Sequence, residues 1–303
     1  MAKQKSLHAL RRRKIPEYIL IYFGLAFFAL MVLFPLAYMV LTAFKPLVEV
    51  VGDATLLPKN PTLENFKVIF RADDAQLLAS RGFEANLITS FFVTIFLFAV
   101  NTVVSLIVCS LAGYAFARFR FKYKNAIFML FMAVMLIPAE MIIIPLYSAY
   151  VQMGMLDTYW PLILPSFFGT NVTMIFMFKQ FYTTVPDALF EAARLDGCNE
   201  LMNLFLIMMP VTLPVYVAQI IMNIGAAYGD VYNPTLYVLS VEKYTLPQYI
   251  MALEKLFSTG SAHYQIPYNL LSAVLIIVLL PAFVAYSFLQ KFFLGGVVTS
   301  GLK

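Results

Sequence analysis

Six long apolar runs set the strongest limit on what this chain can fold into. Five of them contain no Asp, Glu, Lys or Arg, and the sixth contains a single acid, Glu140. Each is long enough for an α-helix to cross a bilayer, which takes about 20 mostly apolar residues. The runs predict an all-α, polytopic membrane protein with six transmembrane helices, at residues 18–44, 85–117, 125–156, 158–178, 201–229 and 256–290.

The composition points to the same class of protein. Of the 303 residues, 62% are hydrophobic and 12% are charged, whereas a soluble domain carries about 25% charged residues. Because so few polar side chains could not cover a soluble core, we expect membrane lipid around the chain. The formal net charge of +5 does not indicate a nucleic-acid partner, since the basic residues lie beside apolar runs and form no stripe.

The Lys and Arg residues indicate which side of the membrane each loop faces. Two-thirds of the 21 Lys and Arg residues fall in alternate segments between the apolar runs, and basic segments of this kind face the cytoplasm. We therefore expect both termini in the cytoplasm, with residues 1–16 as a basic tail and 17–303 as a transmembrane domain. The first apolar run exceeds the 7–15 residues typical of a signal-peptide core, so we expect it to remain as an anchor.

A short polar stretch, EAARLDGCNE at 191–200, interrupts the apolar sequence before the fifth run. Pro186 can begin a helix there and Gly197 can end it in the left-handed conformation. Asn199 can cap a second helix that continues into the bilayer. The spacing i, i+4, i+7 puts three small or apolar residues on one face of the first helix: Ala188, Ala192 and Leu195. From these residues alone, a solvated connector and a helix that docks a partner are equally open.

The polar stretch resembles the EAA motif of bacterial ABC importer permeases, whose pattern is EAA-x3-G-x9-I-x-LP. The chain matches this spacing from Glu191 through Gly197 and Ile207 to Pro210, and only the Leu differs, because Met209 takes its place. The resemblance implies the type I ABC importer permease fold. It also implies a cytoplasmic coupling loop over 180–204, named the EAA loop below, that seats on an ATPase subunit. The implied coupling residues are Glu191, Ala192, Ala193, Arg194, Asp196 and Gly197.

Three further stretches resemble the carbohydrate-importing branch of that family, which includes the six-helix maltose-type permease subunit. They are GYAFARFRFKYKN at 113–125, IPAEMIIIPLY at 137–147 and LQKFFLGGVVTSGLK at 289–303. The resemblance implies a five-helix family core over about 85–290. One stretch departs from the branch: AYGDVYNPTLYVL at 227–239 lacks the Trp-Asn pair common there, and the single tryptophan is Trp160. This variant is similar to permeases for complex polysaccharides and oligosaccharides.

These resemblances imply a permease that moves a carbohydrate, with an oligosaccharide favoured, across a bacterial plasma (inner) membrane. The implied partners are a second homologous permease, two ATPase subunits and an extracytoplasmic solute-binding protein. No GxxxxGK[ST] motif occurs, so we expect ATP and Mg²⁺ on the ATPase subunits and no cofactor, catalytic residue or metal ligand in this chain. Two other interpretations remain: an ion-coupled carrier that works alone, and a membrane scaffold. Copurified ATPase subunits and a second permease would favour the importer.

Two groups of residues are candidates for the solute path. Near the outer end of the fifth run, aromatic rings and hydrogen-bonding groups suit the faces and hydroxyls of a sugar: Tyr228, Asp230, Tyr232 and Asn233. The alternative is an outer loop that docks the binding protein or caps the helix. Glu140 lies between Pro138 and Pro145, which bend the third run, and an acid inside a span rarely faces lipid. It lines the path, pairs with a polar residue such as Asn101, Asn171, Gln219 or Asn223, or lies on the outer surface.

Overall fold

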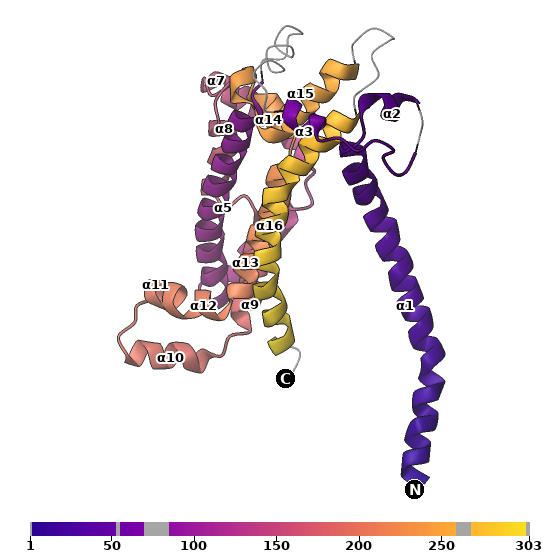
Figure 1. Ribbon diagram of the computed structural model, residues 1–303. Helices are drawn as coiled ribbons and strands as arrows, with labels where there is room; N and C mark the ends of the chain where they lie inside the picture. Colours follow the sequence, from indigo (N-terminus) through magenta and orange to yellow (C-terminus); the bar gives the residue numbers. More distant parts are fainter. Residues whose placement is uncertain (1, 53–54, 70–84, 259–267, 301–303) are drawn as a thin grey trace. The chain divides into compact units, whose positions relative to one another are not determined.

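The computed structural model describes residues 2–52, 55–69, 85–258 and 268–300, and every regular element in these ranges is helical (Figure 1). This agrees with the predicted all-α class. The chain divides into two compact units. Unit 1 comprises Met1–Ser80 and Phe257–Ile277, and unit 2 comprises Arg81–Leu256 and Val278–Lys303.

The helices of the described residues are, in chain order, α1 (Ala2–Ala43), α2 (Leu47–Gly52), α3 (Glu64–Val68), α5 (Leu87–Arg118), α6 (Lys124–Val134), α7 (Ala139–Gln152), α8 (Trp160–Phe167), α9 (Val172–Thr183), α10 (Asp187–Leu195), α11 (Glu200–Met202), the π-helix η1 (Asn203–Met208), α12 (Met209–Val211), α13 (Leu213–Gly229), α14 (Tyr232–Tyr237), the 3₁₀-helix η2 (Val241–Lys243), α15 (Leu246–Ser258) and α16 (Tyr268–Ser300).

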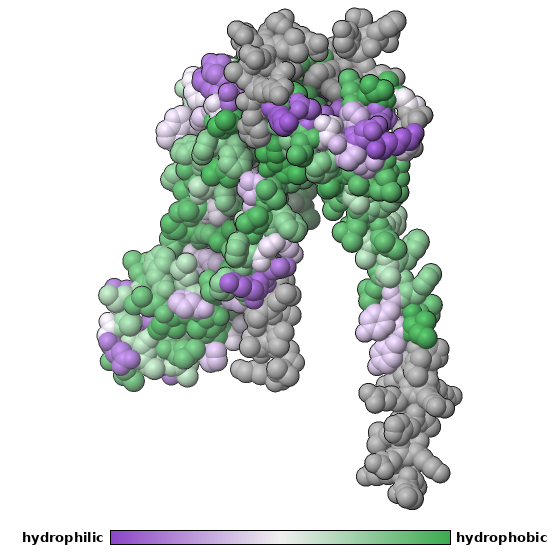
Figure 2. Space-filling view, in the orientation of Figure 1, coloured by the Kyte–Doolittle hydropathy of each residue, from purple (hydrophilic) through white to green (hydrophobic). Residues whose placement is uncertain are grey.

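The lengths and hydropathy of these helices fit the predicted membrane spans. Four stretches are long and apolar enough to cross a membrane: Tyr18–Ala43, Leu87–Arg118, Trp160–Thr183 and Tyr268–Phe292. Two bent pairs pass the same test only together: Lys124–Val134 with Ala139–Gln152, bent by 89°, and Glu200–Val211 with Leu213–Gly229, bent by 79°. With each bent pair taken as one span, the described residues hold up to six spans, the number predicted. Figure 2 shows apolar residues over much of the visible surface of α5.

The fifth predicted helix, 201–229, is not continuous. α11 leads into the π-helix η1 and the short α12, and the chain turns at Thr212 before α13 begins. Pro210 and Pro214 flank this turn, and proline has no N–H to continue a helix. Asn199 caps α11 by accepting a backbone N–H, as predicted. The expectation of one unbroken helix over 201–229 is therefore wrong.

The core of unit 2 lies where α5 packs along α9. Its buried members include Cys109 and Tyr114 from α5 and Phe178 and Tyr182 from α9, and Met208 of η1 joins them. The hydroxyl groups of Tyr182 and Tyr216 lie 2.6 Å apart and are hydrogen-bonded, which links α9 to α13. The core therefore joins α5, α9 and α13 at the end of unit 2 where the EAA loop leaves it (Figure 1).

Unit 1 is held by polar side chains next to the end of α1. Asn65 of α3 donates its amide N–H groups to the carbonyl oxygens of Ala43 and Lys45, both at 2.8 Å. The amide of Asn269, near the start of α16, donates to the side-chain oxygen of Asn65 at 2.9 Å. Glu49 is buried and accepts the backbone N–H of Asn60 at 2.7 Å. These contacts fix the short helices α2 and α3 beside the first span.

Candidate functional site

The EAA loop forms a surface helix closed by a glycine. Pro186 precedes the first turn of α10, and Asp187 is its first-turn acid. The helix ends at Asp196, and Gly197 has a φ of +85°, the left-handed conformation predicted from the sequence. The N–H of Cys198 then donates to the carbonyl of Ala193 at 2.9 Å. A Cβ at Gly197 would meet no atom within 4 Å, so only backbone conformation limits the residue at this position.

α10 presents the predicted apolar face outward. Ala188 and Ala192 are exposed, and Leu195 is 90% exposed, although it is a large apolar residue. Phe190 and Ala193 are the buried residues of α10, so Ala193 faces unit 2 and the other predicted coupling residues are exposed. Those exposed residues are Glu191, Ala192, Arg194, Asp196 and Gly197. The short helix thus has one face packed on unit 2 and one free in this chain.

Arg118, the last residue of α5, fixes the segment that connects α9 to α10. Its guanidinium donates to the carbonyl oxygens of Tyr182 at 3.0 Å and Val185 at 2.6 Å, and it pairs with the carboxylate of Asp187. The guanidinium also lies 4.0 Å from the centre of the Phe190 ring, within the range of a cation–π contact. Arg118 lies in the stretch 113–125 that resembles the permease family, but the sequence did not predict these contacts, because its partners lie about 65 residues further along the chain.

A second contact fixes the other end of α10. The hydroxyl of Tyr114, one turn before Arg118, donates to Glu200 at 2.8 Å. Arg194 of α10 donates to the other carboxylate oxygen of Glu200 at 2.6 Å. That hydrogen bond is the main cause of a raised pKa at Arg194. One end of α10 is therefore bonded directly to α5 and the other is linked to the same face of α5 through Glu200 of α11, connections that sequence reasoning missed.

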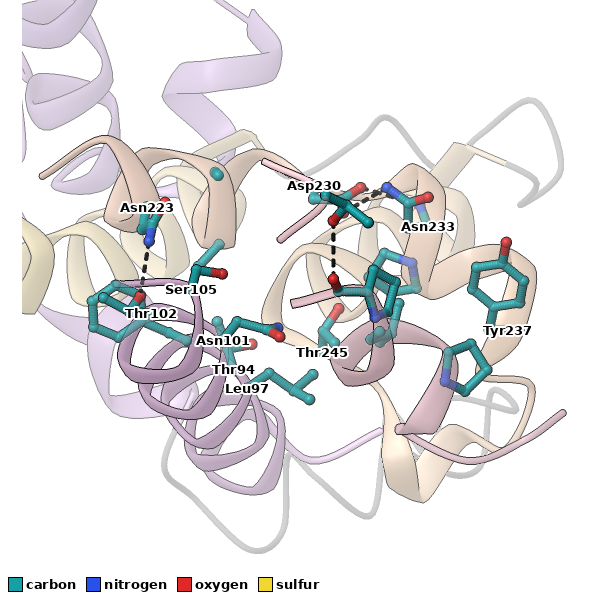
Figure 3. A pocket seen from close by; sticks show the side chains of 18 of the residues that line it. Thr94, Leu97, Asn101, Thr102, Ser105, Asn223, Asp230, Asn233, Tyr237 and Thr245 are labelled. Carbon is teal, nitrogen blue, oxygen red and sulfur yellow. Dashed lines mark hydrogen bonds between the residues drawn. The ribbon is translucent and has the colours of Figure 1, made fainter. Parts of the chain in front are cut away.

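A cavity of about 530 Å³ lies between helices of unit 2 (Figure 3). Its lining includes residues of α8 and α14, which lie at the end of α5 opposite the EAA loop (Figure 1). The hydroxyl and amide groups of the cavity come mainly from α5 and α14, with one from α13, and form a polar set within an apolar bundle. The polar lining residues are Thr94, Asn101, Thr102, Ser105, Thr170, Asn223, Asp230, Asn233, Tyr237 and Thr245. The amide of Asn223 donates to the hydroxyl of Thr102 at 3.3 Å, which joins α13 to α5 across the cavity wall.

The structure brings only part of the predicted solute-path group to this cavity. Asp230 and Asn233 line it, and the carboxylate of Asp230 accepts the backbone N–H of Asn233 at 3.1 Å and its amide at 2.9 Å (Figure 3). Tyr228 is half-buried and Tyr232 is 56% exposed, and neither lines the cavity. Asp230 thus shapes the start of α14 as well as the cavity wall.

Glu140 lies in the first turn of α7, directly after the 89° bend. The bend follows from Pro138, as predicted, because proline has no N–H to donate to the preceding turn. The Glu140 side chain is exposed, and its neighbour Ala139 lines the cavity. Two of the expected partners bond elsewhere: Asn171 caps α9 and Asn223 donates to Thr102.

An ion pair holds two loops together near the cavity. Asp157 has a positive φ of 57°, accepts the backbone N–H groups of Leu239 at 2.9 Å and Ser240 at 2.8 Å, and pairs with Lys243 at 2.7 Å. The Lys243 hydrogen bond, followed by those of Ser240, lowers the pKa of Asp157. Sequence reasoning missed this contact, which joins the loop before α8 to the loop after α14.

The titratable side chains suggest no metal site. Among the residues that the structure describes, no group of three or more His, Cys, Asp or Glu side chains is placed to hold a metal ion. The cysteines Cys109 and Cys198 are both free. What the arrangement offers chemically is a polar cavity at one end of α5 and a bonded surface helix at the other.

Comparison with known proteins identifies permeases of similar length. The chain is 30% identical over 284 residues to the arabinooligosaccharides transport system permease protein AraQ of Halalkalibacterium halodurans, covering 92% of this chain and 94% of that protein. It is 29% identical to the inner membrane ABC transporter permease protein YcjP of Escherichia coli (93% and 95% covered). It is 26% identical to the galactooligosaccharides transport system permease protein GanQ of Bacillus subtilis (96% and 98% covered).

A solved structure has the same fold. One chain of a bacterial ABC transporter involved in the import of the acidic polysaccharide alginate superposes with a TM-score of 0.77, at 19% identity, over 93% of this chain and 98% of that one. This confirms the predicted ABC importer permease fold. Residues 109–297 match a single family model. This range includes α10 and also α13 and α14, which contribute to the cavity wall. The chain belongs to the family of binding-protein-dependent transport system inner membrane components, the permeases of ABC transporters.

Proposed function

We propose that this permease is one transmembrane subunit of an ATP-driven importer that moves an oligosaccharide into the cytoplasm. The observation that carries the proposal is the cavity of about 530 Å³, whose lining alternates hydroxyl and amide groups with apolar side chains. A sugar offers hydroxyls for the former and carbon–hydrogen faces for the latter. Relatives named for arabino- and galactooligosaccharides support the same class of solute.

ATP is bound and hydrolysed by two separate ATPase subunits, one of which seats on α10. The exposed face of Ala188, Ala192 and Leu195 suits close contact with a partner, since small side chains let another surface approach. Glu191 and Asp196 are exposed beside this face and can meet basic groups. The EAA loop then lies in the cytoplasm with both termini, as the Lys and Arg distribution favours. ATP and Mg²⁺ belong to the ATPase subunits, and this chain carries no cofactor of its own.

A second, homologous permease completes the path, and an extracytoplasmic solute-binding protein delivers the sugar. Glu140 supports the second permease, because an exposed carboxylate in a membrane span is costly against lipid and is relieved by a protein partner or water-filled path. The outer ends of α8, α14 and the Asp157–Lys243 pair form the side from which the sugar enters. Lipid surrounds the remaining apolar surface.

Proteoliposomes that contain the complete transporter test the proposal. Uptake of a labelled arabino- or galactooligosaccharide should require internal ATP and the binding protein. ATPase subunits and the second permease should copurify with this chain. Uptake driven by an ion gradient without ATP would instead identify a carrier, and an intact complex without any sugar uptake would favour a scaffold.

A further inference from the structure

We infer that Tyr114 and Arg118 are positioning residues that fix both ends of α10 to α5, so that a movement of α10 reaches the cavity through α5. The alternative route follows the chain from α10 through η1 and α12 into α13. The inference rests on the proposed function in one respect, because it takes α10 as the helix that an ATPase subunit moves. It goes beyond that function by assigning the helix through which a movement of α10 reaches the cavity.

The route into α13 is locally weak. After α11 the chain forms a π-helix and then breaks at Thr212, where the axis turns by 79°. Asn203, the first residue of the π-helix, is fully buried, and neither its amide N–H₂ nor its carbonyl oxygen has a hydrogen-bond partner among the described residues. A buried polar group without a partner is destabilising, and π-helical turns occur frequently at functional sites. A push on α11 would therefore be absorbed in η1 before it reached α13.

The connection before α10 is stiff by comparison. Only residues 184–186 separate α9 from α10. The guanidinium of Arg118 binds this link through the carbonyl oxygens of Tyr182 and Val185 and through the carboxylate of Asp187. Several directional bonds from one planar group restrict rotation more than a single bond would. The side chain of Arg118 is largely buried, which partly shields its bonds to the two carbonyl oxygens from water, whereas the Asp187 carboxylate is exposed.

The connection after α10 is fixed to the same helix before the π-helix begins. Glu200 accepts from Tyr114 at 2.8 Å and from Arg194 at 2.6 Å, so the start of α11 is bonded to α5 and to α10. Tyr114 and Arg118 are four residues apart and lie on one face of α5. The two contacts together hold α10 on α5 at both ends.

α5 continues from these contacts to the cavity without a break. It is a single helix over Leu87–Arg118, and Ser105, Thr102 and Asn101 of its middle part line the cavity. At 1.5 Å per residue, Ser105 is about 13 Å from Tyr114 along the axis. Gly113 lets α9 pack directly against α5 between the two, which adds stiffness. A displacement of α10 therefore moves the polar wall of the cavity that α5 provides.

The test measures how cavity residues respond to nucleotide in the complete reconstituted transporter. Cys109 and Cys198 are replaced by serine, and one cavity residue becomes a reporter cysteine, either Ser105→Cys on α5 or Ala226→Cys on α13. The rate at which a small thiol reagent modifies the reporter is compared without nucleotide and with the ATPase subunits trapped by ATP and vanadate. Both reporters line the same cavity, but one lies on α5 and the other on α13, so comparing them separates the two routes.

We expect the native contacts to give a nucleotide-dependent rate at Ser105→Cys. Tyr114→Phe together with Arg118→Gln should reduce that dependence about fivefold or more, within the usual range of coupling between sites, while the ATPase subunits still copurify. Tyr114→Phe alone should give a smaller reduction, and it removes only the hydroxyl group while keeping the ring. Arg120→Ala is the matched control, because Arg120 is exposed and lies in the same basic turn. Thr212→Gly, which loosens only the route into α13, should leave the response intact.

Two results overturn the inference and differ from a failure of the proposed function. The Tyr114 and Arg118 variants could keep the full nucleotide response in assembled complexes, or Thr212→Gly could abolish it. Either result would place the route in α13. A nucleotide response at Ala226→Cys without one at Ser105→Cys in the chain with native contacts would also place the route in α13. If neither reporter responds, or no ATPase subunit copurifies, the proposed function fails and the inference falls with it.

Discussion

Gly113 of α5 lies so close to α9 that a Cβ built on it would come within 2.6 Å of the Cβ of Phe178. The same Cβ would lie 3.1 Å from the backbone nitrogen of Lys179 and 3.3 Å from the carbonyl oxygen of Ile175. Two of these three atoms belong to backbone, which cannot rotate away. The absence of a side chain at Gly113 is thus what lets α5 and α9 pack as one layer next to the EAA loop.

Gly113→Ala should therefore destabilise the protein. Forcing a methyl group into a filled contact costs about 1–3 kcal/mol, and we expect a lower midpoint of thermal unfolding in detergent. Gly225→Ala in α13 is the matched control, since a Cβ there meets nothing within 4 Å and alanine favours a helix. Equal midpoints for the two variants would contradict the close packing of α5 and α9.

Gly197→Val should uncouple the transporter through backbone strain. The φ of +85° is rarely adopted by a β-branched residue, and the strain costs about 1–3 kcal/mol. Because a Cβ at Gly197 would meet no atom of this chain within 4 Å, the strain within the chain comes from the backbone conformation. We expect the protein to insert in the membrane but to lose solute-stimulated ATP hydrolysis. Gly197→Asn should be milder, since asparagine tolerates this conformation better.

Gly154 supplies a control for that experiment. Its φ is +66°, and its Cβ would also meet nothing within 4 Å, but it lies in the loop after α7. Gly154→Val should strain the backbone similarly and keep solute-stimulated hydrolysis in whatever protein assembles. If both variants lose stimulation equally, the effect is on stability and not on coupling.

Acid should weaken the contact between the loops at Asp157 and Lys243. The pKa of Asp157 is lowered in the folded state, chiefly by the hydrogen bond from Lys243. A carboxylate with a lowered pKa stabilises the fold above its unfolded pKa of about 4, and this contribution is lost as pH falls toward the folded value. We expect Asp157→Asn to lower the unfolding midpoint at pH 7 and to reduce the further loss below about pH 4. Parallel pH profiles for the two proteins would contradict this.

The sequence predicted what depends on local pattern. Uncharged length indicated the spans, and the glycine at 197 indicated a left-handed helix end, because both follow from a few adjacent residues. The bend before Glu140 was also predictable from Pro138. Pro210 and Pro214 carried the same signal for the break at Thr212, but the apolar run across them favoured one helix.

The cavity and the contacts of α10 could not be predicted in this way. The amide of Asn223 meets Thr102 across 121 positions of sequence, and Arg118 meets Val185 across 67. Such pairs depend on the register between packed helices, which one sequence does not specify. Asn101 and Asn223 were considered only as partners of Glu140, while their place in the cavity follows from how α5 and α13 pack.

Glu140→Gln should slow solute uptake while the complex still assembles. The change keeps the shape of the side chain and removes only its charge. Slower uptake would therefore show that the charge acts in the path. The measurement is ATP-driven uptake in proteoliposomes beside basal ATP hydrolysis. Failure to assemble would show that the exposed acid holds a partner subunit, and unchanged uptake would show that it does not line the path.

Asn101 should contribute directly to sugar binding. Its side-chain carbonyl oxygen is buried and has no hydrogen-bond partner among the described residues, and the residue lines the cavity on the α5 wall. A sugar hydroxyl that donated to this oxygen would satisfy it. A typical hydrogen bond contributes about 0.5–1.5 kcal/mol, which corresponds to an affinity change of about two- to twelvefold.

Asn101→Leu should therefore raise the KM for oligosaccharide uptake by a factor within that range and leave ATPase assembly intact, because leucine has the same branched shape but no acceptor. Tyr232→Phe serves as the control, since the Tyr232 side chain is largely exposed and does not line the cavity. Initial uptake rates across a series of sugar concentrations separate KM from maximal rate. An unchanged KM in Asn101→Leu, or an equal change in Tyr232→Phe, would place the bound sugar elsewhere than against the α5 wall.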